Sequence, residues 1–296
     1  MTKPGQKKRL LLTGASGFLG WNICRQAPAE WEIYGLTFSH PLSIPGTTII
    51  QTDLRNFKAL KNLFKRVRPQ AVMHTAAVSD PNFCQLHPEE TSAINVRASL
   101  QIADLSAEAR IPCLFTSSDL VFDGRHSPYS EADLPVPINR YGEQKVMAEE
   151  GMRTRYPEMI ICRLPLMFGD SGPVAQSFLQ PLLEAIREDR EVPCFVDEFR
   201  TPVSGKAAAR GLFLALDQAV GIIHLGGRER ISRFDFGLLV KKSLESNRVK
   251  LIPCRQKDIN MPAPRPSDVS LNSNKAFSLG FEPPSLVEEL RDCVGF

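Results

Sequence analysis

The sequence predicts an α/β fold in which a doubly wound parallel sheet is followed by a smaller C-terminal lobe. Two observations support this prediction. Apolar segments of strand length alternate with helical periodicity through residues 9–163, and repeated βα units of this kind form parallel sheets with helices on both faces. After residue 163 the alternation stops, and prolines and glycines separate shorter segments. We therefore expect a sheet domain over residues 1–163 and a second lobe over residues 164–296.

Each expected element has its own pattern. The helix at 57–67 repeats apolar residues at intervals of three and four, and the long helix at 89–109 ends before a proline. A helix at 207–220 and a strand at 221–225 are expected to return to the sheet, so that residues 206–226 belong to the first domain. The proline-rich stretch 252–266 predicts an extended surface segment. The remaining strands are expected at 9–12, 32–37, 48–52, 71–74, 113–117 and 159–163, and the remaining helices at 18–25 and 139–156.

Three glycines stand between the first expected strand and the first expected helix. Gly14 permits a tight turn, Gly17 permits the close approach of a phosphate, and Gly20 permits close packing of helix on strand. Backbone N–H groups and the helix dipole favour an anion at this helix N-terminus. By itself the pattern also fits an ordinary strand, turn and helix. Together with the residues described next, it predicts a Rossmann-type, dinucleotide-binding sheet.

Tyr141 and Lys145 lie one turn apart on one face of an expected helix. A tyrosine hydroxyl has an ordinary pKa of about 10, and a neighbouring ammonium favours the phenolate and lowers that pKa. Tyr141 is therefore a candidate general acid or base on a carbonyl group. Ser118 follows the expected strand 113–117, at the sheet edge where ligands gather, and its hydroxyl can polarise the same carbonyl. A chance Tyr-x-x-x-Lys in an amphipathic helix is the alternative for the pair alone.

These motifs, in this order, resemble the extended short-chain dehydrogenase/reductase family, and within it the dTDP-4-dehydrorhamnose reductases. The resemblance covers about residues 9 to 290. The general family motifs are T-G-x-x-G-x-x-G from Thr13, D-L from Asp53, H-T-A-A from His74, N-V from Asn95, Ser118, Tyr141-x-x-x-Lys145 and R-x-P-x-x-F-G from Arg163. The more specific segments are S-S-D-L-V-F-D-G from Ser117, D-E-F-R-T-P from Asp197, and Arg265-Pro266 followed by S-L-N from Ser270 and by Lys275.

The resemblance implies roles for individual residues. Tyr141 would donate a proton to a sugar carbonyl, Lys145 would lower its pKa and hold the nicotinamide ribose, and Ser118 stands where the family usually has threonine. Arg200 is a candidate clamp for a sugar nucleotide, although the family position is not usually arginine and an ion pair is the alternative. The expected substrate-binding residues are Ser79, Asp119, Phe199 and Arg200. The expected cofactor-binding residues are Gly14, Ser16, Gly17, Phe18, Leu19, Thr37, Ser39, His40, Asp53, Leu54, Ala76, Ala77, Asn95, Tyr141 and Lys145.

The end of the second strand bears on the choice of cofactor. An acidic residue there would bind the ribose 2′-hydroxyl of NAD and repel a 2′-phosphate, and none is present. Thr37, Ser39 and His40 can accommodate a phosphate. We therefore expect NADP(H) in preference to NAD(H), although no arginine stands at this strand end to bind the 2′-phosphate.

Three functions remain open at this point. The resemblance favours NAD(P)H-dependent reduction of the C4 keto group of a nucleotide-linked deoxysugar. A sugar-nucleotide 4-epimerase would use the same Tyr and Lys but retain its NAD, and a non-catalytic NADP-binding regulatory subunit, like the methionine adenosyltransferase β subunit, would have the same architecture. Dehydratases often carry glutamate where this chain has Leu120, so dehydration is disfavoured.

Composition limits the remaining possibilities. A net charge of +3 does not by itself indicate nucleic-acid binding. The sequence contains no stretch of about 18 apolar residues, so no membrane-spanning helix is expected. Its seven cysteines are scattered and form no C-x-x-C pair, which favours reduced thiols. We expect a cytoplasmic enzyme that binds a nucleotide sugar and no nucleic acid, membrane or dedicated metal. A homodimer is an open expectation, since dimers are common in the family.

Overall fold

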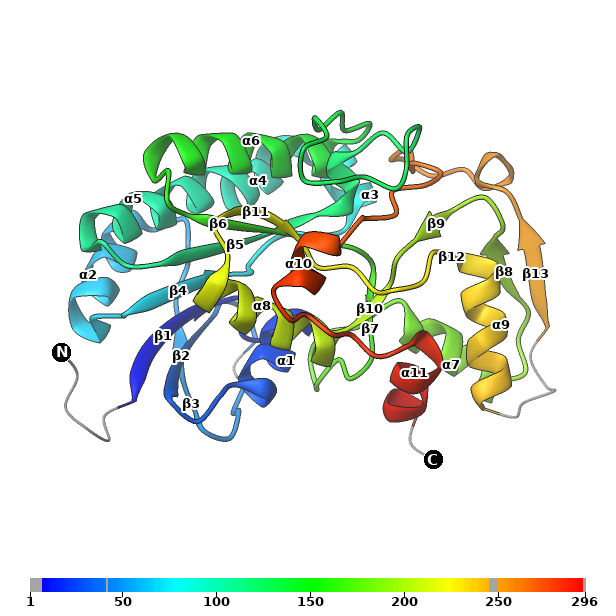
Figure 1. Cartoon of the computed structure of the whole chain (residues 1–296), viewed down its shortest axis with the longest axis horizontal. Coiled ribbons are helices and arrows are strands. Elements are labelled where there is room, and N and C mark those ends of the chain that lie inside the picture. The colour runs from blue at the N-terminus through cyan, green and yellow to red at the C-terminus, as the bar shows by residue number, and fades with distance from the viewer. Residues whose placement is uncertain (1–6, 41, 245–249, 295–296) are drawn as a thin grey trace.

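A computed structural model describes residues 7–40, 42–244 and 250–294 of the chain. Its centre is a seven-stranded parallel sheet with the strand order β11-β6-β5-β4-β1-β2-β3 (Figure 1), which confirms the predicted α/β class. The order reverses direction between β1 and β4, and ligands of doubly wound sheets bind beyond the carboxyl ends of the strands at such a point. The strands are β1 Lys8–Thr13, β2 Trp31–Thr37, β3 Thr47–Gln51, β4 Ala71–His74, β5 Cys113–Ser118, β6 Ile160–Leu164 and β11 Gly221–His224.

Helices cover both faces of this sheet. Alternate residues of β1 show why: Leu10 and Leu12 pack into one apolar cluster and Leu11 into another, all without exposed surface. The first cluster lies under α1 Phe18–Gln26 and α8 Gly205–Gln218. The second lies under α2 Phe57–Val67, α5 Ser99–Ala109 and α6 Arg140–Arg155. The expected strand at 221–225 forms β11, which pairs with β6 at the sheet edge.

The prediction of one continuous helix at 89–109 is wrong because a π-helical turn interrupts it. The structure has α4 Pro88–Ser92, then a π-helical turn, η1 Ala93–Ala98, and then α5. Polar side chains here bond to other segments: the Asn95 amide bonds to the Val78 N–H and carbonyl, and Ser99 Oγ bonds to His74 Nε2 at 2.9 Å. Apolar periodicity does not reveal such a turn, which is frequent at functional sites.

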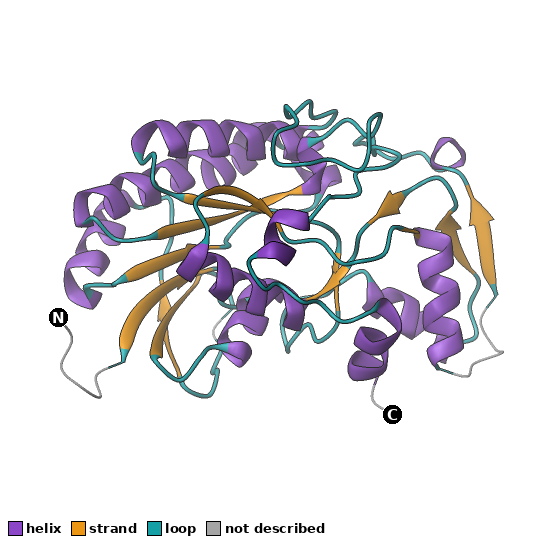
Figure 2. Cartoon of the chain, in the orientation of Figure 1, coloured by secondary structure: helices purple, strands orange, loops and turns teal. Residues whose placement is uncertain are grey.

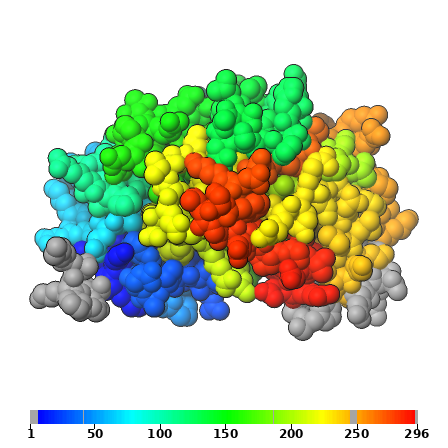
Figure 3. Space-filling view, viewed as in Figure 1, coloured from blue at the N-terminus to red at the C-terminus, as the bar shows by residue number. Residues whose placement is uncertain are grey.

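The second lobe packs around its own apolar cluster, which includes Phe168, Phe236 and Leu290. Its strands pair two by two, and helices pack beside them (Figure 2). In the space-filling view the C-terminal segment, in orange and red, lies on the surface between the sheet domain and this lobe (Figure 3). The elements are α7 Leu179–Arg187, α9 Arg233–Ser243, α10 Asn274–Ser278, α11 Leu286–Val294, and the pairs β7 Met167–Phe168 with β10 Val203–Ser204, β8 Val192–Phe195 with β13 Leu251–Cys254, and β9 Phe199–Arg200 with β12 Ile231–Ser232.

The prediction of an extended surface segment at 252–266 holds for most of its residues, which are exposed or half-buried, and is wrong at Ala263 and Pro266, which are buried. Its first residues form β13, which pairs with β8 at an edge where proline is tolerated. Farther along, Ala263 is fully buried and its N–H donates to Asn82 Oδ1 at 3.2 Å. The segment therefore crosses back to the sheet domain, because proline restricts the backbone without preventing burial.

Three further features concern the described part of the chain. No helix there is long and apolar enough to cross a membrane. No group of three histidine, cysteine or acidic side chains is arranged to hold a metal ion among those residues. The seven cysteines are free thiols.

Candidate active site

A cavity of about 310 Å³ lies beyond the carboxyl ends of β1, β2, β3 and β4. Gly14 forms its floor with a φ of 74°, and a Cβ on Gly14 would lie 2.9 Å from the backbone N of Ala76. Only glycine therefore fits between the two loops. The lining residues are Gly14, Ser16, Gly17, Leu36, Thr37, Phe38, Ser39, Thr52, Asp53, Leu54, Arg55, Thr75, Ala76, Ala77, Val78 and Ile94.

The N-terminus of α1 opens beside this cavity. Gly17 occupies the N-cap position and offers no side-chain cap to the first turn. The backbone N–H groups of that turn can therefore serve a bound anion, as they do in pyrophosphate sites. Phe18 and Leu19 lie in this turn, consistent with backbone contacts but without lining the cavity. A Cβ on Gly20 would lie 2.1 Å from the Gly14 carbonyl oxygen, so Gly20 sets the close packing of helix on loop.

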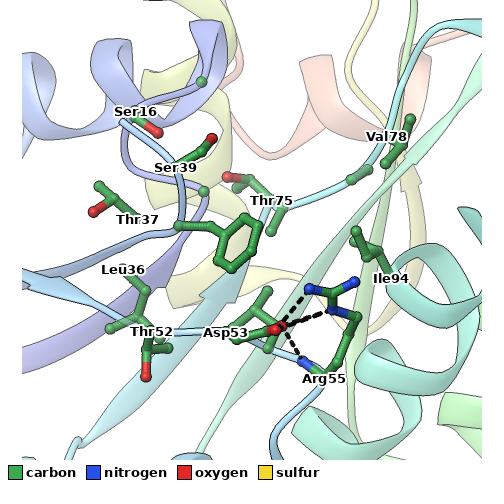
Figure 4. A pocket seen from close by; sticks show the side chains of 16 residues that line it. Ser16, Leu36, Thr37, Ser39, Thr52, Asp53, Arg55, Thr75, Val78 and Ile94 are labelled. Carbon is green, nitrogen blue, oxygen red and sulfur yellow. Dashed lines mark hydrogen bonds and ion pairs between the residues drawn. The ribbon is translucent and has the colours of Figure 1, made fainter. Parts of the chain in front are cut away.

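At the far end of the cavity the predicted cofactor residue Asp53 pairs with Arg55, which was not singled out from the sequence. Arg55 donates to both carboxylate oxygens of Asp53, at distances of 2.8 to 3.1 Å (Figure 4). This hydrogen bonding lowers the pKa of Asp53. The guanidinium also lies 5.3 Å from the ring centre of Phe38. His40 does not line this cavity; its Nδ1 bonds to the Ser39 hydroxyl at 2.9 Å.

A buried hydrogen-bond chain holds the cavity wall formed by residues 75–78. Thr13 Oγ1 accepts from the N–H groups of Thr75 and Ala76 at 3.1 Å each, so its own hydrogen points to His74 Nδ1 at 2.7 Å. His74 Nε2 then donates to Ser99 Oγ at 2.9 Å. Burial lowers the pKa of His74 to about 3, so the ring stays neutral and keeps this direction of bonds. His74 therefore has a structural role here.

Asn95 acts on the same wall from behind. Its Oδ1 accepts from the Val78 N–H at 2.8 Å, and its Nδ2 donates to the Val78 carbonyl and to Gln144 Oε1. Asn95 is buried and does not line the cavity. Its expected cofactor role is therefore, in this structure, an indirect one through the position of Val78.

A second cavity of about 430 Å³ adjoins the first along the loop after β4, and it extends between the sheet domain and the second lobe. Ser79, Ser118, Asp119, Tyr141 and Arg200, all predicted from the sequence, lie in its wall. The other lining residues are Pro81, Ser117, Leu120, Leu164, Pro165, Leu166, Met167, Phe195, Glu198, Arg233, Met261 and Arg265.

Tyr141 and Lys145 share the face of α6 that packs against β5. Asn139 caps this helix by accepting from the Gly142 N–H, and Lys145 Nζ donates to the Thr116 carbonyl at 2.8 Å. Both side chains are buried, and Lys145 Nζ lies 5.8 Å from the centre of the Tyr141 ring. Burial lowers the pKa of Lys145 to about 8.

The predicted lowering of the Tyr141 pKa is wrong for the protein without ligand. Burial raises that pKa, the charge of the Asp119 carboxylate adds to the rise, and a hydrogen bond with Ser118 opposes it. The physical reason is that Lys145 directs its ammonium to a backbone carbonyl and not to the phenol oxygen. Tyr141 is therefore a protonated phenol at neutral pH, which is the form that can donate a proton.

Ser118 leads from Tyr141 to a buried group of charges. Its hydroxyl donates to Asp119 Oδ1 at 3.1 Å and accepts from the Leu120 N–H at 3.2 Å. Asp119 Oδ2 lies 3.4 Å from Arg200 Nε, and Arg200 also lies 3.5 Å from Glu198. Arg200 thus takes part in buried ion pairs within the cavity wall.

The side chains of Phe199 and Arg200 point to opposite faces of β9. Residues alternate on β9, so Arg200 faces the cavity while the Phe199 ring packs against Arg230, 3.8 Å from its guanidinium carbon. Phe199 therefore does not line this cavity, contrary to the expectation of a direct substrate contact. Phe195, Arg233 and Arg265 also lie in the wall, and none of the three was predicted to be a site residue. Arg233 is the first residue of α9, and no sequence motif marks it.

The short helix α3 Pro81–Leu86 was not predicted, although the sequence before it contains a recognisable helix start. Asp80 accepts from the N–H groups of Asn82 and Phe83, and Pro81 occupies the first turn. An acidic cap followed by proline is typical of a helix start. This short helix places Ser79 and Pro81 at the second cavity.

Comparisons with known proteins place these features in a family context. The family model described as RmlD substrate binding domain matches residues 8–295. A probable low-salt glycan biosynthesis reductase of Haloferax volcanii is 27% identical, over 94% of this chain and 95% of that protein. Methionine adenosyltransferase 2 subunit beta of Danio rerio is 25% identical, over 94% of this chain and 87% of that protein.

Solved structures show the same fold. The dTDP-4-dehydrorhamnose reductase of Bacillus anthracis in complex with NADP superposes with a TM-score of 0.85 at 21% identity, covering 98% of this chain and 99% of that one. A hypothetical dTDP-4-dehydrorhamnose reductase of Sulfolobus tokodaii has a TM-score of 0.82 at 29% identity, covering 94% of this chain and 98% of that one.

Proposed function

Because the chain belongs to the RmlD substrate binding domain family, we propose that it is an NADPH-dependent oxidoreductase that reduces the C4 keto group of a nucleotide-linked deoxysugar, as dTDP-4-dehydrorhamnose reductases do. One observation carries this proposal. The loop after β4 lines the first cavity, with its glycine floor, up to Val78, and from Ser79 on it lines the second, whose wall holds Ser118 and the phenol of Tyr141.

The residues present fit a bound dinucleotide. The glycine floor and the uncapped start of α1 would receive the pyrophosphate, and Asp53 with Leu54 would flank the adenine. When bound, NADPH would supply the hydride. Tyr141 supplies the proton to the carbonyl oxygen, Ser118 orients and polarises that carbonyl, and the Lys145 ammonium favours the developing charge on the phenol oxygen.

The charges of the second cavity suit a nucleoside diphosphate sugar. Three arginines, Arg200, Arg233 and Arg265, lie in its wall with only two acidic groups, Asp119 and Glu198. A buried atom of Arg233, Nη1, has no hydrogen-bond partner. Guanidinium groups match phosphate oxygens in pairs. We assign the diphosphate to these arginines, with Arg200 as one member and not the sole clamp.

Arg55 supports NADPH as the cofactor. It brings a positive charge to the adenosine end of the first cavity, across from Ser39 (Figure 4), where the sequence lacked an arginine at the strand end. Its ion pair with Asp53 is half exposed, so breaking it costs little. The Bacillus anthracis reductase of the same fold was solved with NADP.

Replacing Arg55 by alanine is expected to weaken NADPH binding about tenfold or more and to leave NADH binding unchanged, because only NADPH carries the 2′-phosphate. Titration of the quenching of protein fluorescence by each cofactor measures both affinities. Arg125→Ala is the matched control, since Arg125 also pairs with an aspartate two residues earlier and lies away from the cavity. An equal loss for NADPH and NADH would show that Arg55 does not read the phosphate.

The reductase proposal is tested by NADPH consumption with dTDP-4-dehydro-L-rhamnose. The wild-type chain is expected to consume NADPH only when the keto sugar nucleotide is present. Tightly held NAD that is not consumed would support the 4-epimerase. NADPH that binds without turnover, together with tight binding of a partner protein, would support a regulatory subunit and contradict the proposal.

A further inference from the structure

Asp119 occupies a position between the catalytic serine and the arginines of the second lobe. It starts the short 3-10 helix η2 Asp119–Val121 directly after β5, on the sheet domain. One carboxylate oxygen accepts from the Ser118 hydroxyl at 3.1 Å. The other, Oδ2, is buried, has no hydrogen-bond partner, and lies 3.4 Å from Arg200 on β9 of the second lobe. Both side chains are about 5% exposed.

In this arrangement Ser118 is not available to a substrate. Its one hydrogen points to Asp119, so it cannot also donate to a sugar carbonyl. A change at Asp119 is needed before Ser118 can act.

We propose that Asp119 is a positioning residue that couples binding of the substrate diphosphate at Arg200 to the direction of the Ser118 hydroxyl. This inference rests on the proposed function, because the diphosphate belongs to the sugar nucleotide. Arg200 Nη1 already donates to the carbonyls of Phe199 and Pro266, so phosphate oxygens compete for Nε and Nη2, which face the two carboxylates. When phosphate takes these N–H groups, Asp119 loses its counter-charge in a buried place. A buried carboxylate without a counter-charge takes up a proton.

Protonation reverses the hydrogen bond between the two residues. The proton comes from solvent and binds to the carboxylate, which then donates to Ser118 Oγ. Ser118 Oγ keeps its contact with the Leu120 N–H, and its own hydrogen is released to the substrate carbonyl. No covalent bond other than the O–H bond of Asp119 forms.

The surrounding charges are consistent with such a change. Burial raises the pKa of Asp119 to about 6, the charge of Glu198 adds to the rise, and Arg200 and Ser118 oppose it. Tyr141 faces Asp119 from α6, Arg200 faces it from β9, and Glu198 faces it from the residue just before β9. Removal of the Arg200 charge therefore acts on a carboxyl that already lies close to protonation.

Asparagine and alanine at position 119 separate this role from a merely structural one. Asparagine presents an N–H to Ser118 and a carbonyl oxygen to Arg200, which reproduces the protonated form. Asp119→Asn is therefore expected to keep most of kcat. Asp119→Ala removes the side chain that orients the Ser118 hydroxyl, and it is expected to lower kcat about 100-fold, the order found when one carbonyl-binding donor is lost. NADPH affinity and circular dichroism verify that both variants are folded. Equal kcat values for the two variants would overturn the proposal.

Calorimetry gives a second readout that needs no turnover. Thymidine diphosphate is titrated into the protein near neutral pH in buffers of different ionisation enthalpy, which reports the protons taken up on binding. Wild type is expected to take up more protons than Asp119→Asn, because only the carboxylate can be protonated. Equal uptake would overturn the coupling. Normal uptake without turnover of any keto sugar nucleotide would instead overturn the proposed function and keep the coupling.

Discussion

Replacing Tyr141 by phenylalanine is expected to lower kcat by about 10²- to 10⁴-fold, the range contributed by a positioned general acid. The change removes one oxygen and the proton that the reduction requires. Since burial keeps Tyr141 protonated, wild type holds this proton at neutral pH. The ring itself remains, so packing against Lys145 and the affinity for NADPH should stay the same.

The matched control is Tyr129→Phe. Tyr129 is also buried, and its hydroxyl donates to Asp123 at 2.6 Å, outside both cavities. Loss of this hydroxyl should affect stability more than kcat. Steady-state kinetics and cofactor titration on both variants check the expectation, and normal turnover by Tyr141→Phe would refute the assigned proton donor.

Replacing Glu149 by glutamine is expected to lower the free energy of unfolding by about 3–5 kcal/mol, the cost of leaving a buried charge without its partner. Glu149 on α6 accepts from Arg163 Nε at 3.0 Å and from Nη2 at 2.7 Å, and their side chains are 4% and 1% exposed. Arg163 keeps its charge in the variant, and its Nη1 already lacks a hydrogen-bond partner. Nearby Phe122, 5.1 Å from the guanidinium carbon, offers only its ring face.

Urea unfolding followed by circular dichroism measures this loss. Glu191→Gln is the control, because Glu191 pairs with Lys250 at the surface and its removal should cost within about 1 kcal/mol. Equal losses in the two variants would show that the buried pair does not hold α6 against β6. Because α6 carries Tyr141 and β6 leads into the second cavity, a large loss should also reduce the thermal stability of the active enzyme.

The strands and helices of the sheet domain could be predicted because short stretches of sequence determine them. The strand at 71–74 and the helix at 57–67 have the predicted bounds, since each is an uninterrupted apolar run or a clear helical repeat. The glycines, Ser118 and the pair on α6 were found because chemistry at the carboxyl edge of a parallel sheet needs those residue types there.

The rest depends on contacts between distant residues. The π-helical turn follows from bonds of Asn95 and Ser99 to other segments, which periodicity does not encode. Arg55 follows β3 in the sequence, and it reaches the cofactor cavity only because the turn after β3 lies beside the end of β2 in the fold. On β9, the choice between Phe199 and Arg200 is set by which face meets the sheet domain, and Arg233 reaches the cavity from a lobe without a recognisable motif.

The most direct test of the central claim is to follow the hydride itself. NADPH labelled with deuterium at C4 of the nicotinamide is incubated with the wild-type chain and dTDP-4-dehydro-L-rhamnose, and the sugar product is examined by NMR. We expect deuterium at C4 of the sugar, one for each NADPH consumed, and incorporation at least about 100-fold slower with Tyr141→Phe under the same conditions. A product without deuterium at C4, or an isomerised sugar with the cofactor unconsumed, would contradict the claim that this site reduces a sugar carbonyl.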